Sequence, residues 1–216
     1  MGLLDLLLPG ACAGCGRYGA VICAPCLASM QPAGDEPDRF AAPDQGVVVG
    51  HAMELAIAAF AHEGAMRRAL QRLKYGGAGR LAVPLARIAA PSLERLLIQS
   101  GSAALVPVPV HDARRRQRGY NQAELLSTEL SRIVQLPVAD VLERHRPTTR
   151  QHGLGRAARL HNMRGALGVR RGARVPPVAI VVDDILTTAA TLEACAETLR
   201  GHGADRVFGF AVAREV

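Results

Sequence analysis

The sequence predicts an α/β fold, a central and mostly parallel sheet flanked by helices, with a small four-cysteine module at the N-terminus. From residue 47 onward, strand-like and helix-like patterns alternate along the chain. Residues 178–182 form a continuous apolar run, which is typical of a parallel strand buried on both faces. Two Cys-x2-Cys pairs stand close together before residue 27. We therefore expect two domains, residues 1–46 and residues 47–216.

The composition fits one sizeable domain with a small appendage. The chain has 216 residues, of which 49% are hydrophobic, so an ordinary core can be buried. It contains three Tyr, four Phe and no Trp, which argues against a protein built around base-stacking platforms. The formal net charge is +7, mostly from arginine, which favours bidentate contacts with phosphate or carboxylate. Phosphorylated substrates or nucleic acid are therefore candidate partners, while a genome that prefers arginine to lysine explains the total charge equally well.

The N-terminal segment MGLLDLLLPG does not fit a secretory signal peptide. It lacks a basic region, Asp5 interrupts its apolar stretch and Pro9 ends it. The expectation is a short amphipathic helix packed on the main body. No run approaches the roughly 18 apolar residues that span a bilayer. We therefore expect no membrane span and a cytoplasmic location, where cysteines stay reduced and paired spacings indicate metal rather than disulfides.

The cysteine spacing predicts a structural zinc site. Two Cys-x2-Cys knuckles are separated by seven residues, and the four thiols are those of Cys12, Cys15, Cys23 and Cys26. The two-residue gap lets a tight turn aim two thiolates at one ion, and four thiolates leave no coordination position open for catalysis. An iron–sulfur or redox site is the alternative. Cys195 lies in a helical pattern and is expected to be a small buried residue. The Pro-, Gly- and acid-rich residues 31–46 are expected to be a linker.

The main domain is expected to begin with an extended segment or hairpin arm over residues 53–62. Residues 65–75 have a helical pattern that stops at Gly76 and Gly77, and a second helix follows over residues 81–99. Asn121 is a natural N-cap for a helix over residues 121–134, with Glu124 three residues on. Strands are expected over residues 103–108, 178–182 and 206–212, and a helix over residues 191–202.

The chemistry is concentrated directly after the apolar run. Asp183 and Asp184 follow the expected strand, and a loop of small and hydroxyl residues leads into a helix; its candidate binding residues are Thr187, Thr188, Ala189, Ala190 and Thr191. Ligands of open α/β sheets bind at the carboxyl ends of strands, and a loop entering a helix aims backbone N–H groups at an anion. Two adjacent carboxylates repel each other unless a cation or a donor such as a ribose diol lies nearby. The alternative is a plain strand–turn–helix with two solvent-facing aspartates.

This pattern resembles the phosphoribosyl pyrophosphate motif of type I phosphoribosyltransferases. The resemblance implies that Asp183 and Asp184, the candidate catalytic residues, face the ribose hydroxyls, and that residues 187–191 bind the 5-phosphate. It also implies the type I phosphoribosyltransferase fold and a Mg²⁺ ion bound with the substrate. One departure is Ala189, where that family usually has glycine. If this residue adopts a left-handed backbone, alanine costs on the order of 1 kcal/mol.

A second cluster follows the expected strand over residues 103–108. The segment HDARRRQRGYNQAELL carries Arg114, Arg115, Arg116 and Arg118. A strand that ends in prolines and opens into these arginines is a poor helix start, so we expect a mobile basic loop. Pyrophosphate would be its natural cargo, whereas a solvated or nucleic-acid-facing loop is the alternative.

Together these segments resemble the competence protein F (ComF) family, which is amidophosphoribosyltransferase-like. The shared features, in order, are the cysteine knuckles, LKYGG, PVP, RRQRGYNQAELL, RPTTRQHGLGRAARLHNMRGAL and VVDDILTTAATL. The resemblance implies that Pro107 and Val108 belong to a pyrophosphate-facing loop, and that the segment with Arg114 and Arg118 closes over the substrate. Lys74 and Tyr75 could reach the site. An equally good interpretation of Lys74 is a lysine at a helix end that interacts favourably with the helix dipole. A polar signature, either a further phosphate contact or a solvated basic helix, comprises Gln151, Arg156, Arg159, Asn162 and Arg164.

Two functions remain open from the sequence. In the first, the protein holds phosphoribosyl pyrophosphate or a related ribose phosphate with Mg²⁺, serves DNA uptake, and transfers the ribose phosphate to an unknown acceptor. No histidine is placed by a motif as a base, and most are expected at the surface; the seven are His51, His62, His111, His145, His152, His161 and His202. In the second, the fold is a non-catalytic competence factor that binds single-stranded DNA or DNA-uptake proteins.

Overall fold

The computed structural model describes residues 10–33, 52–75, 78–145, 165–187 and 189–215. Several features expected from the sequence lie outside these ranges: the helix of the first ten residues, most of the linker, Gly76 and Gly77, Thr188, and the polar signature from Gln151 to Arg164. No helix in the described ranges is long and apolar enough to cross a membrane.

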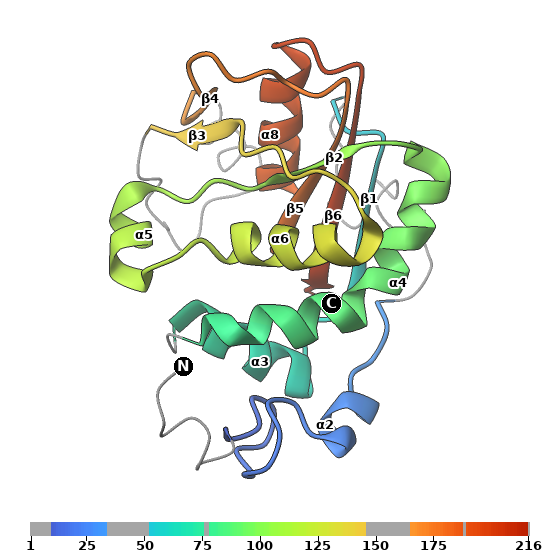
Figure 1. Cartoon of the computed structure of the whole chain (residues 1–216), viewed down its shortest axis with the longest axis vertical. Coiled ribbons are helices and arrows are strands. Elements are labelled where there is room, and N and C mark those ends of the chain that lie inside the picture. The colour runs from blue at the N-terminus through green and yellow to red at the C-terminus, as the bar shows by residue number, and fades with distance from the viewer. Residues whose placement is uncertain (1–9, 34–51, 76–77, 146–164, 188, 216) are drawn as a thin grey trace.

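A four-stranded parallel sheet forms the centre of the protein (Figure 1). Its strands are β1 (Leu55–Ala61), β2 (Ala104–Pro107), β5 (Val178–Leu186) and β6 (Arg206–Arg214), in the order β1-β6-β5-β2. Every pairing in this sheet is parallel. A small antiparallel pair, β3 (Leu142–Arg144) with β4 (Leu167–Val169), lies apart from it. This is the predicted architecture, a central parallel sheet flanked by helices.

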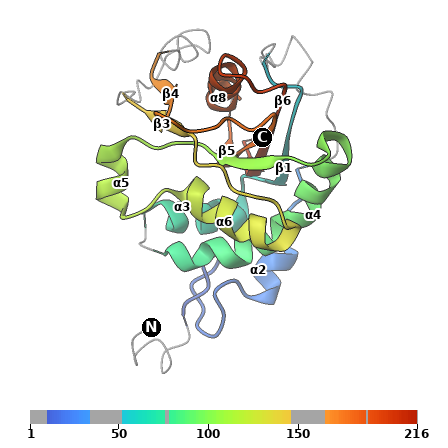
Figure 2. The ribbon, with the colours of Figure 1, turned by 45° about the horizontal axis from the view of Figure 1, so that its top comes forward.

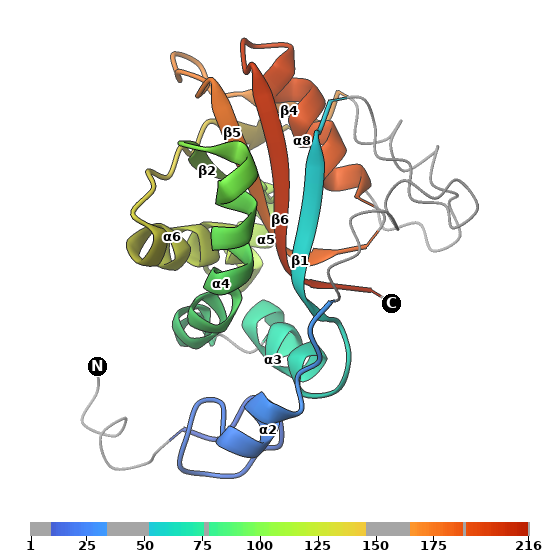
Figure 3. The ribbon, with the colours of Figure 1, turned by 90° about the vertical axis from the view of Figure 1, so that its right-hand side faces the viewer.

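Helices cover both faces of the sheet (Figure 3). On one side lie α3 (Gly64–Tyr75), α4 (Ala82–Ser100) and α6 (Gln122–Val134), and on the other side lies α8 (Ala190–Arg200). The shorter helices are α2 (Ala24–Ala28), η3 (Gly79–Leu81) and α5 (Asp112–Arg118). The cysteine-bearing segment and α2 lie beside α3, at the end of the molecule away from α8 (Figure 2).

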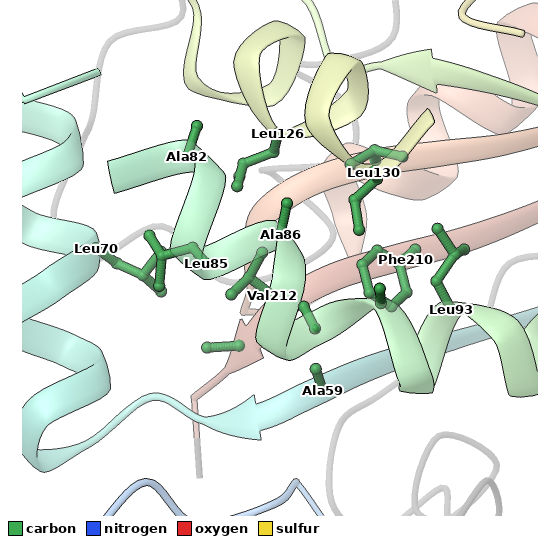
Figure 4. Packing of buried hydrophobic residues seen from close by; sticks show 14 of the residues in the cluster. Ala59, Leu70, Ala82, Leu85, Ala86, Leu93, Leu126, Leu130, Phe210 and Val212 are labelled. Carbon is green, nitrogen blue, oxygen red and sulfur yellow. The ribbon is translucent and has the colours of Figure 1, made fainter. Parts of the chain in front are cut away.

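The larger core cluster fills the space between the sheet and α3, α4 and α6 (Figure 4). Leu85 and Leu93 of α4, Leu126 of α6 and Phe210 of β6 belong to this cluster, and Leu93 lies beside Phe210. On the opposite face, Gly209 has no room for a side chain, because an added Cβ would lie 2.7 Å from the Met53 sulfur. Close packing of this kind fixes β6 between β1 and β5.

Most of the expected elements are confirmed, and one is wrong. The segment from Arg114 to Arg118 is not a loop but helix α5. The His111 side chain caps it by accepting a hydrogen bond from the Ala113 N–H at 3.2 Å, and Asp112 stands in its first turn. Gly119, in the left-handed region at φ 81°, ends it. These local capping interactions favour a helix even though the segment follows a strand that ends in prolines.

Two strands also differ from the expectation in detail. Of the two readings of residues 53–62, the structure supports an extended strand, because β1 pairs in parallel with β6 and is not a hairpin arm. β5 does not stop at Val182 but continues through Asp183 and Asp184 to Leu186. The two carboxylates therefore belong to the strand itself and not to the loop after it.

Ala189, the residue before α8, adopts the left-handed backbone that the glycine of the resembling motif would favour. Its φ is 54° and its ψ is −7°, and it is 4% exposed. An alanine in this region is strained by the contact between its Cβ and the following carbonyl. The turn is held in place by the strand before it and the helix after it.

Ala189→Gly is therefore expected to stabilise the fold. Glycine relieves the strain but loses more chain entropy on folding, so the net gain should be about 0.5–1 kcal/mol in the free energy of unfolding. Urea unfolding followed by circular dichroism measures it. Ala194→Gly makes the same chemical change within α8 and should instead cost about 1 kcal/mol. Equal destabilisation by both variants would show that position 189 carries no strain.

Candidate functional site

The candidate site lies at the carboxyl end of β5, one of the two central strands of the sheet. Val182 of β5 pairs with Pro107 of β2, and the Val108 N–H donates to the Val182 carbonyl at 2.9 Å. The Asn121 side chain donates to the Val108 carbonyl at 2.9 Å and caps α6. The structure therefore brings Pro107 and Val108 beside the start of the acidic pair, as the sequence predicts.

The two carboxylates point to opposite faces of the sheet, because successive side chains of a strand alternate. Asp184 shares its face with Ile180 and Val182, which pack on the side of α3, α4 and α6. Asp183 shares the other face with Ala179 and Val181, which pack on the side of α8. The pair is therefore not one double carboxylate but two separately surrounded groups.

Asp184 is paired within the protein. It is 5% exposed, and its Oδ2 lies 2.8 Å from the Nζ of Lys74 in the last turn of α3. A buried carboxylate is stable only with such a partner. Of the 26 Lys and Arg residues in the chain, Lys74 is the one lysine. The structure thus places Lys74 in the site rather than at a helix end facing solvent.

Among the described residues, no ion pair to Asp183 comparable to the one between Lys74 and Asp184 is found. Burial, together with the negative charge of Asp184, raises the pKa of Asp183 to about 8, although Lys74 and the Asp184 N–H, which donates to Asp183 at 2.8 Å, act in the opposite direction. Burial and the charge of Arg114 lower the pKa of Arg144, while Cys195 and Asp183 raise it. Arg144 of β3 and Arg114 of α5 therefore share an electrostatic environment with Asp183. Arg144 was missed by the sequence analysis, because only the β3–β4 pairing brings it to this edge.

His62 is a second residue that the motifs did not single out. It directly follows β1, so it lies at the same carboxyl edge of the sheet as the acidic pair. Burial lowers the pKa of His62, with Glu215 raising it and Lys74 lowering it. Its Nε2 is buried and has no hydrogen-bond partner among the described residues. The available sequence signal was a histidine as the last residue of the extended segment expected over residues 53–62.

Helix α5 is held beside the end of α3. The Arg118 guanidinium lies 5.1 Å from the centre of the Tyr75 ring. The Tyr120 hydroxyl, just after α5, donates to the Leu73 carbonyl. Arg115 forms an ion pair with Glu124 of α6 at 3.0 Å. Arg118 is thus brought to Tyr75, the residue that follows Lys74 in α3.

The expected phosphate loop connects β5 to α8. Thr187 is exposed, Ala189 and Ala190 are buried, and α8 begins at Ala190. An eleven-residue helix directs its positive dipole end toward this loop. Thr191, in the first turn of the helix, is partly buried. The strand, loop and helix arrangement predicted from the sequence is confirmed.

The four cysteines near the N-terminus converge as the knuckle spacing predicts. One sulfur from each of Cys12, Cys15, Cys23 and Cys26 lies within 4.8 Å of the other three. The Cys15 and Cys23 sulfurs are 3.7 Å apart, and sulfurs bound tetrahedrally at zinc lie about 3.8 Å apart. Burial opposes ionisation of Cys12, but N–H donors of Cys23, Cys15 and Gly14 lower its pKa to about 6. The set therefore fits zinc.

Fold and site together define an α/β protein with an acidic pair, a helix-entry loop and a basic rim at the carboxyl edge of its sheet, joined to a four-cysteine metal module. No family model matches the chain. It is similar to Competence protein F of Haemophilus influenzae, with 35% identity over 114 residues, 51% of this chain and 50% of that protein. It is also similar to DNA utilization protein YhgH of Escherichia coli K12, with 32% identity over 104 residues, 48% of this chain and 45% of that protein.

A third relative is DNA utilization protein YhgH of Salmonella typhimurium, with 28% identity over 145 residues, 64% of this chain and 62% of that protein. The chain spans about half the length of the first two relatives. These matches confirm the resemblance to the competence protein F family that the sequence motifs indicated.

Asp183→Asn is expected to stabilise the protein at neutral to alkaline pH. The pKa of Asp183 is about 8 in the folded protein but about 4 when unfolded, so ionisation disfavours folding increasingly as the pH rises from about 4 to about 8. Asparagine removes this penalty. Two pKa values four units apart set an upper bound of about 5 kcal/mol on the gain at pH 8, each kcal/mol raising Tm by about 2–4 °C, and the gain should vanish near pH 4.

Thermal unfolding at pH 4, 6 and 8 without added Mg²⁺ measures this difference. Asp140→Asn is the matched control, since Asp140 is exposed and paired with Arg170 at 3.2 Å. The control should show no gain that grows with pH. A loss of stability in Asp183→Asn at pH 8 would contradict the assignment.

Proposed function

We propose that the protein binds phosphoribosyl pyrophosphate, or a related ribose 5-phosphate compound, at the carboxyl edge of its sheet. The observation that carries the proposal is the convergence of separate segments on one edge. The acidic pair of β5 meets four other segments there: the loop into α8, the end of β2 at Pro107 with Val108 after it, the last turn of α3, and α5. Ligands of open α/β sheets bind at such an edge.

Each segment has a role that follows from its chemistry. Asp183 accepts hydrogen bonds from ribose hydroxyls, while Asp184 holds Lys74 in the site. The loop from Thr187 to Thr191 donates N–H and hydroxyl groups to the 5-phosphate. Pro107 and Val108 expose backbone beside the pyrophosphate. Arginine side chains of α5, Arg114 and Arg118, supply positive charge where pyrophosphate develops negative charge on leaving.

The proposal includes a Mg²⁺ ion bound with the ligand. Asp183 fits this ion, because its raised pKa marks a carboxylate with an unmet demand for positive charge. Mg²⁺ prefers carboxylate and phosphate oxygens, and when bound it neutralises pyrophosphate. Asp184 already has Lys74 as its cation. Asp183 would therefore hold the ion, and Asp184 would keep Lys74 in place.

The role of the site in the cell is proposed from the relatives. Their names are competence and DNA utilization proteins, so we propose that this chain serves DNA uptake. The four-thiolate zinc module needs reduced cysteines, which agrees with a cytoplasmic location. The proposed division is a module of residues 1–46 and a phosphoribosyltransferase-like domain of residues 47–216. These contacts assign no acceptor, so the proposal is one of binding, with transfer as its possible extension.

Calorimetry with phosphoribosyl pyrophosphate tests the binding proposal. The wild type should bind in the presence of Mg²⁺, and the double variant Asp183→Asn, Asp184→Asn should bind at least about tenfold more weakly, because ribose and metal contacts are both lost. Asp183→Asn alone keeps the Lys74 partner intact and should show most of the loss. Asp140→Asn, at an exposed site, should bind as the wild type does. No binding to the zinc-loaded wild type would remove the proposal.

A second candidate function, single-stranded DNA binding, is favoured by a specific pocket. It has a volume of about 430 Å³ and is lined by Arg68, Gln71, Arg72 and Tyr75 on the outer face of α3. Tyr75 is 65% exposed, and an exposed ring can stack a base while guanidinium groups of the neighbouring helix α5 hold phosphates. The basic helix α5 adjoins it through Arg118.

Fluorescence anisotropy with a labelled oligonucleotide at several salt concentrations tests this second function. Affinity should fall with salt with a log–log slope of about −0.7 per phosphate contact. Tyr75→Ala should weaken binding by about 1–3 kcal/mol through the lost stacking. Arg132→Ala, which removes an exposed arginine of α6, should change little. A flat salt response would exclude phosphate-driven DNA binding and leave the ribose-phosphate site as the function.

A further inference from the structure

The first cysteine knuckle is bound directly to helix α3. The Arg72 guanidinium donates to the Cys12 carbonyl at 2.8 Å, and the Arg68 Nε donates to the Gly14 carbonyl. A Cβ on Gly14 would lie 3.1 Å from the Ala65 Cβ, so the knuckle backbone lies against the first turn of the helix. Positions 65, 68 and 72 share one helical face. One face of α3, formed by Ala65, Arg68 and Arg72, therefore contacts the metal module.

The other end of the same helix is bound to the candidate ribose-phosphate site. The Leu73 carbonyl accepts from the Tyr120 hydroxyl, and Lys74 pairs with Asp184 at 2.8 Å. Arg72 and Lys74 are two residues apart in one continuous helix. A helix is stiff over such a length, so a displacement at Arg72 moves Lys74 with it.

The knuckle keeps its shape through the metal. It contains few residues and two turns, and its two Cys-x2-Cys pairs must be brought together by the ion that they bind. When the ion leaves, the Cys12 and Gly14 carbonyls are no longer fixed, and Arg72 and Arg68 lose ordered acceptors. Helix α3 then keeps its core contacts through Met66, Leu70 and Leu73 but loses the contacts that fix its outer face.

We propose that Arg68 and Arg72 are positioning residues that couple the zinc module to the ribose-phosphate site by fixing helix α3, and with it Lys74, against Asp184. The inference rests on the proposed function for its ligand. Zinc binding and ribose-phosphate binding then strengthen each other, since a coupling between two sites is reciprocal. Neither arginine touches the ligand in this scheme.

The unique lysine gives a readout that needs no ligand. Acylation of amines by a soluble succinimidyl ester, followed by peptide mass spectrometry, measures the reactivity of Lys74 against the N-terminal amine as reference. A Lys74 held against Asp184 reacts slowly. Removing zinc with a chelator, or the double change Arg68→Ala, Arg72→Ala, should raise its reactivity about fivefold.

Arg67→Ala is the matched control, because among the described residues the hydrogen bonds from arginines of α3 to the knuckle come from Arg68 and Arg72 and not from Arg67. The variants should retain their circular dichroism spectrum and about one equivalent of zinc when it is supplied in excess. If the double arginine change leaves Lys74 as protected as Arg67→Ala does, the coupling is wrong. This outcome is independent of whether phosphoribosyl pyrophosphate binds.

The reciprocal arm uses the ligand. Zinc-loaded protein should bind phosphoribosyl pyrophosphate with Mg²⁺ about fivefold more tightly than metal-depleted protein. The ligand should in turn slow zinc transfer to a chromogenic chelator in the wild type, but not in Arg68→Ala, Arg72→Ala. Binding that is equal with and without zinc overturns the coupling. Absence of binding by the zinc-loaded wild type instead removes the proposed function, while the Lys74 readout still decides whether the module fixes α3.

Discussion

The ion pair between Lys74 and Asp184 is the contact on which the arrangement of the site depends. A carboxylate in the middle of a parallel sheet cannot stay ionised without a cation. The pair, at 2.8 Å, requires the last turn of α3 to lie over the carboxyl end of β5. That position brings Tyr75 to Arg118 of α5 and places the outer face of α3 where the cysteine module binds it. One buried charge thus links the sheet, the basic helix and the metal module.

The elements around the acidic pair were predictable because their signals are local. An apolar run of five residues has one stable solution, a strand buried on both faces, and β5 contains it. Asn121 and Glu124 form a capping pattern that needs no tertiary contact, and the structure shows the Asn121 side chain accepting from the Ala123 N–H. The spacing of the four cysteines is likewise a local signal, because each Cys-x2-Cys pair can bind one ion through a single turn. Local signals of this kind can be recognised in the sequence because they do not depend on contacts with distant segments.

The residues that were missed depend on contacts between distant segments. Arg144 reaches the neighbourhood of Asp183 only because β3 pairs with β4, more than twenty residues later. His62 joins the edge because β1 pairs with β6, which is more than 140 residues away. The loop predicted in place of helix α5 was wrong for another reason, because that prediction rested on the charge of the four arginines. The cap formed by His111 and the stop at Gly119 were local signals of a helix.

Lys74 shows how composition can identify a site residue. The chain contains 25 arginines and one lysine. The preference for arginine in the rest of the chain therefore does not hold at position 74. An ammonium is a compact charge that fits a single buried carboxylate, whereas a guanidinium is wider and has five donors to satisfy. The presence of a single lysine was therefore a stronger indication of a site residue than its position at a helix end. That position explains a positive charge but not why the residue is lysine and not arginine.

The two aspartates illustrate how neighbouring identical residues acquire different tasks. Strand alternation sends Asp184 to the face of α3, where Lys74 neutralises it, and Asp183 to the face of α8, where burial and its neighbour raise its pKa to about 8. The first contributes to folding, while the second weakens it at neutral pH in the absence of a cation. A group that destabilises its own fold is most simply understood as one kept for a ligand. In the proposed function, Asp183 would hold the bound cation, while the ion pair of Asp184 with Lys74 fixes the position of α3.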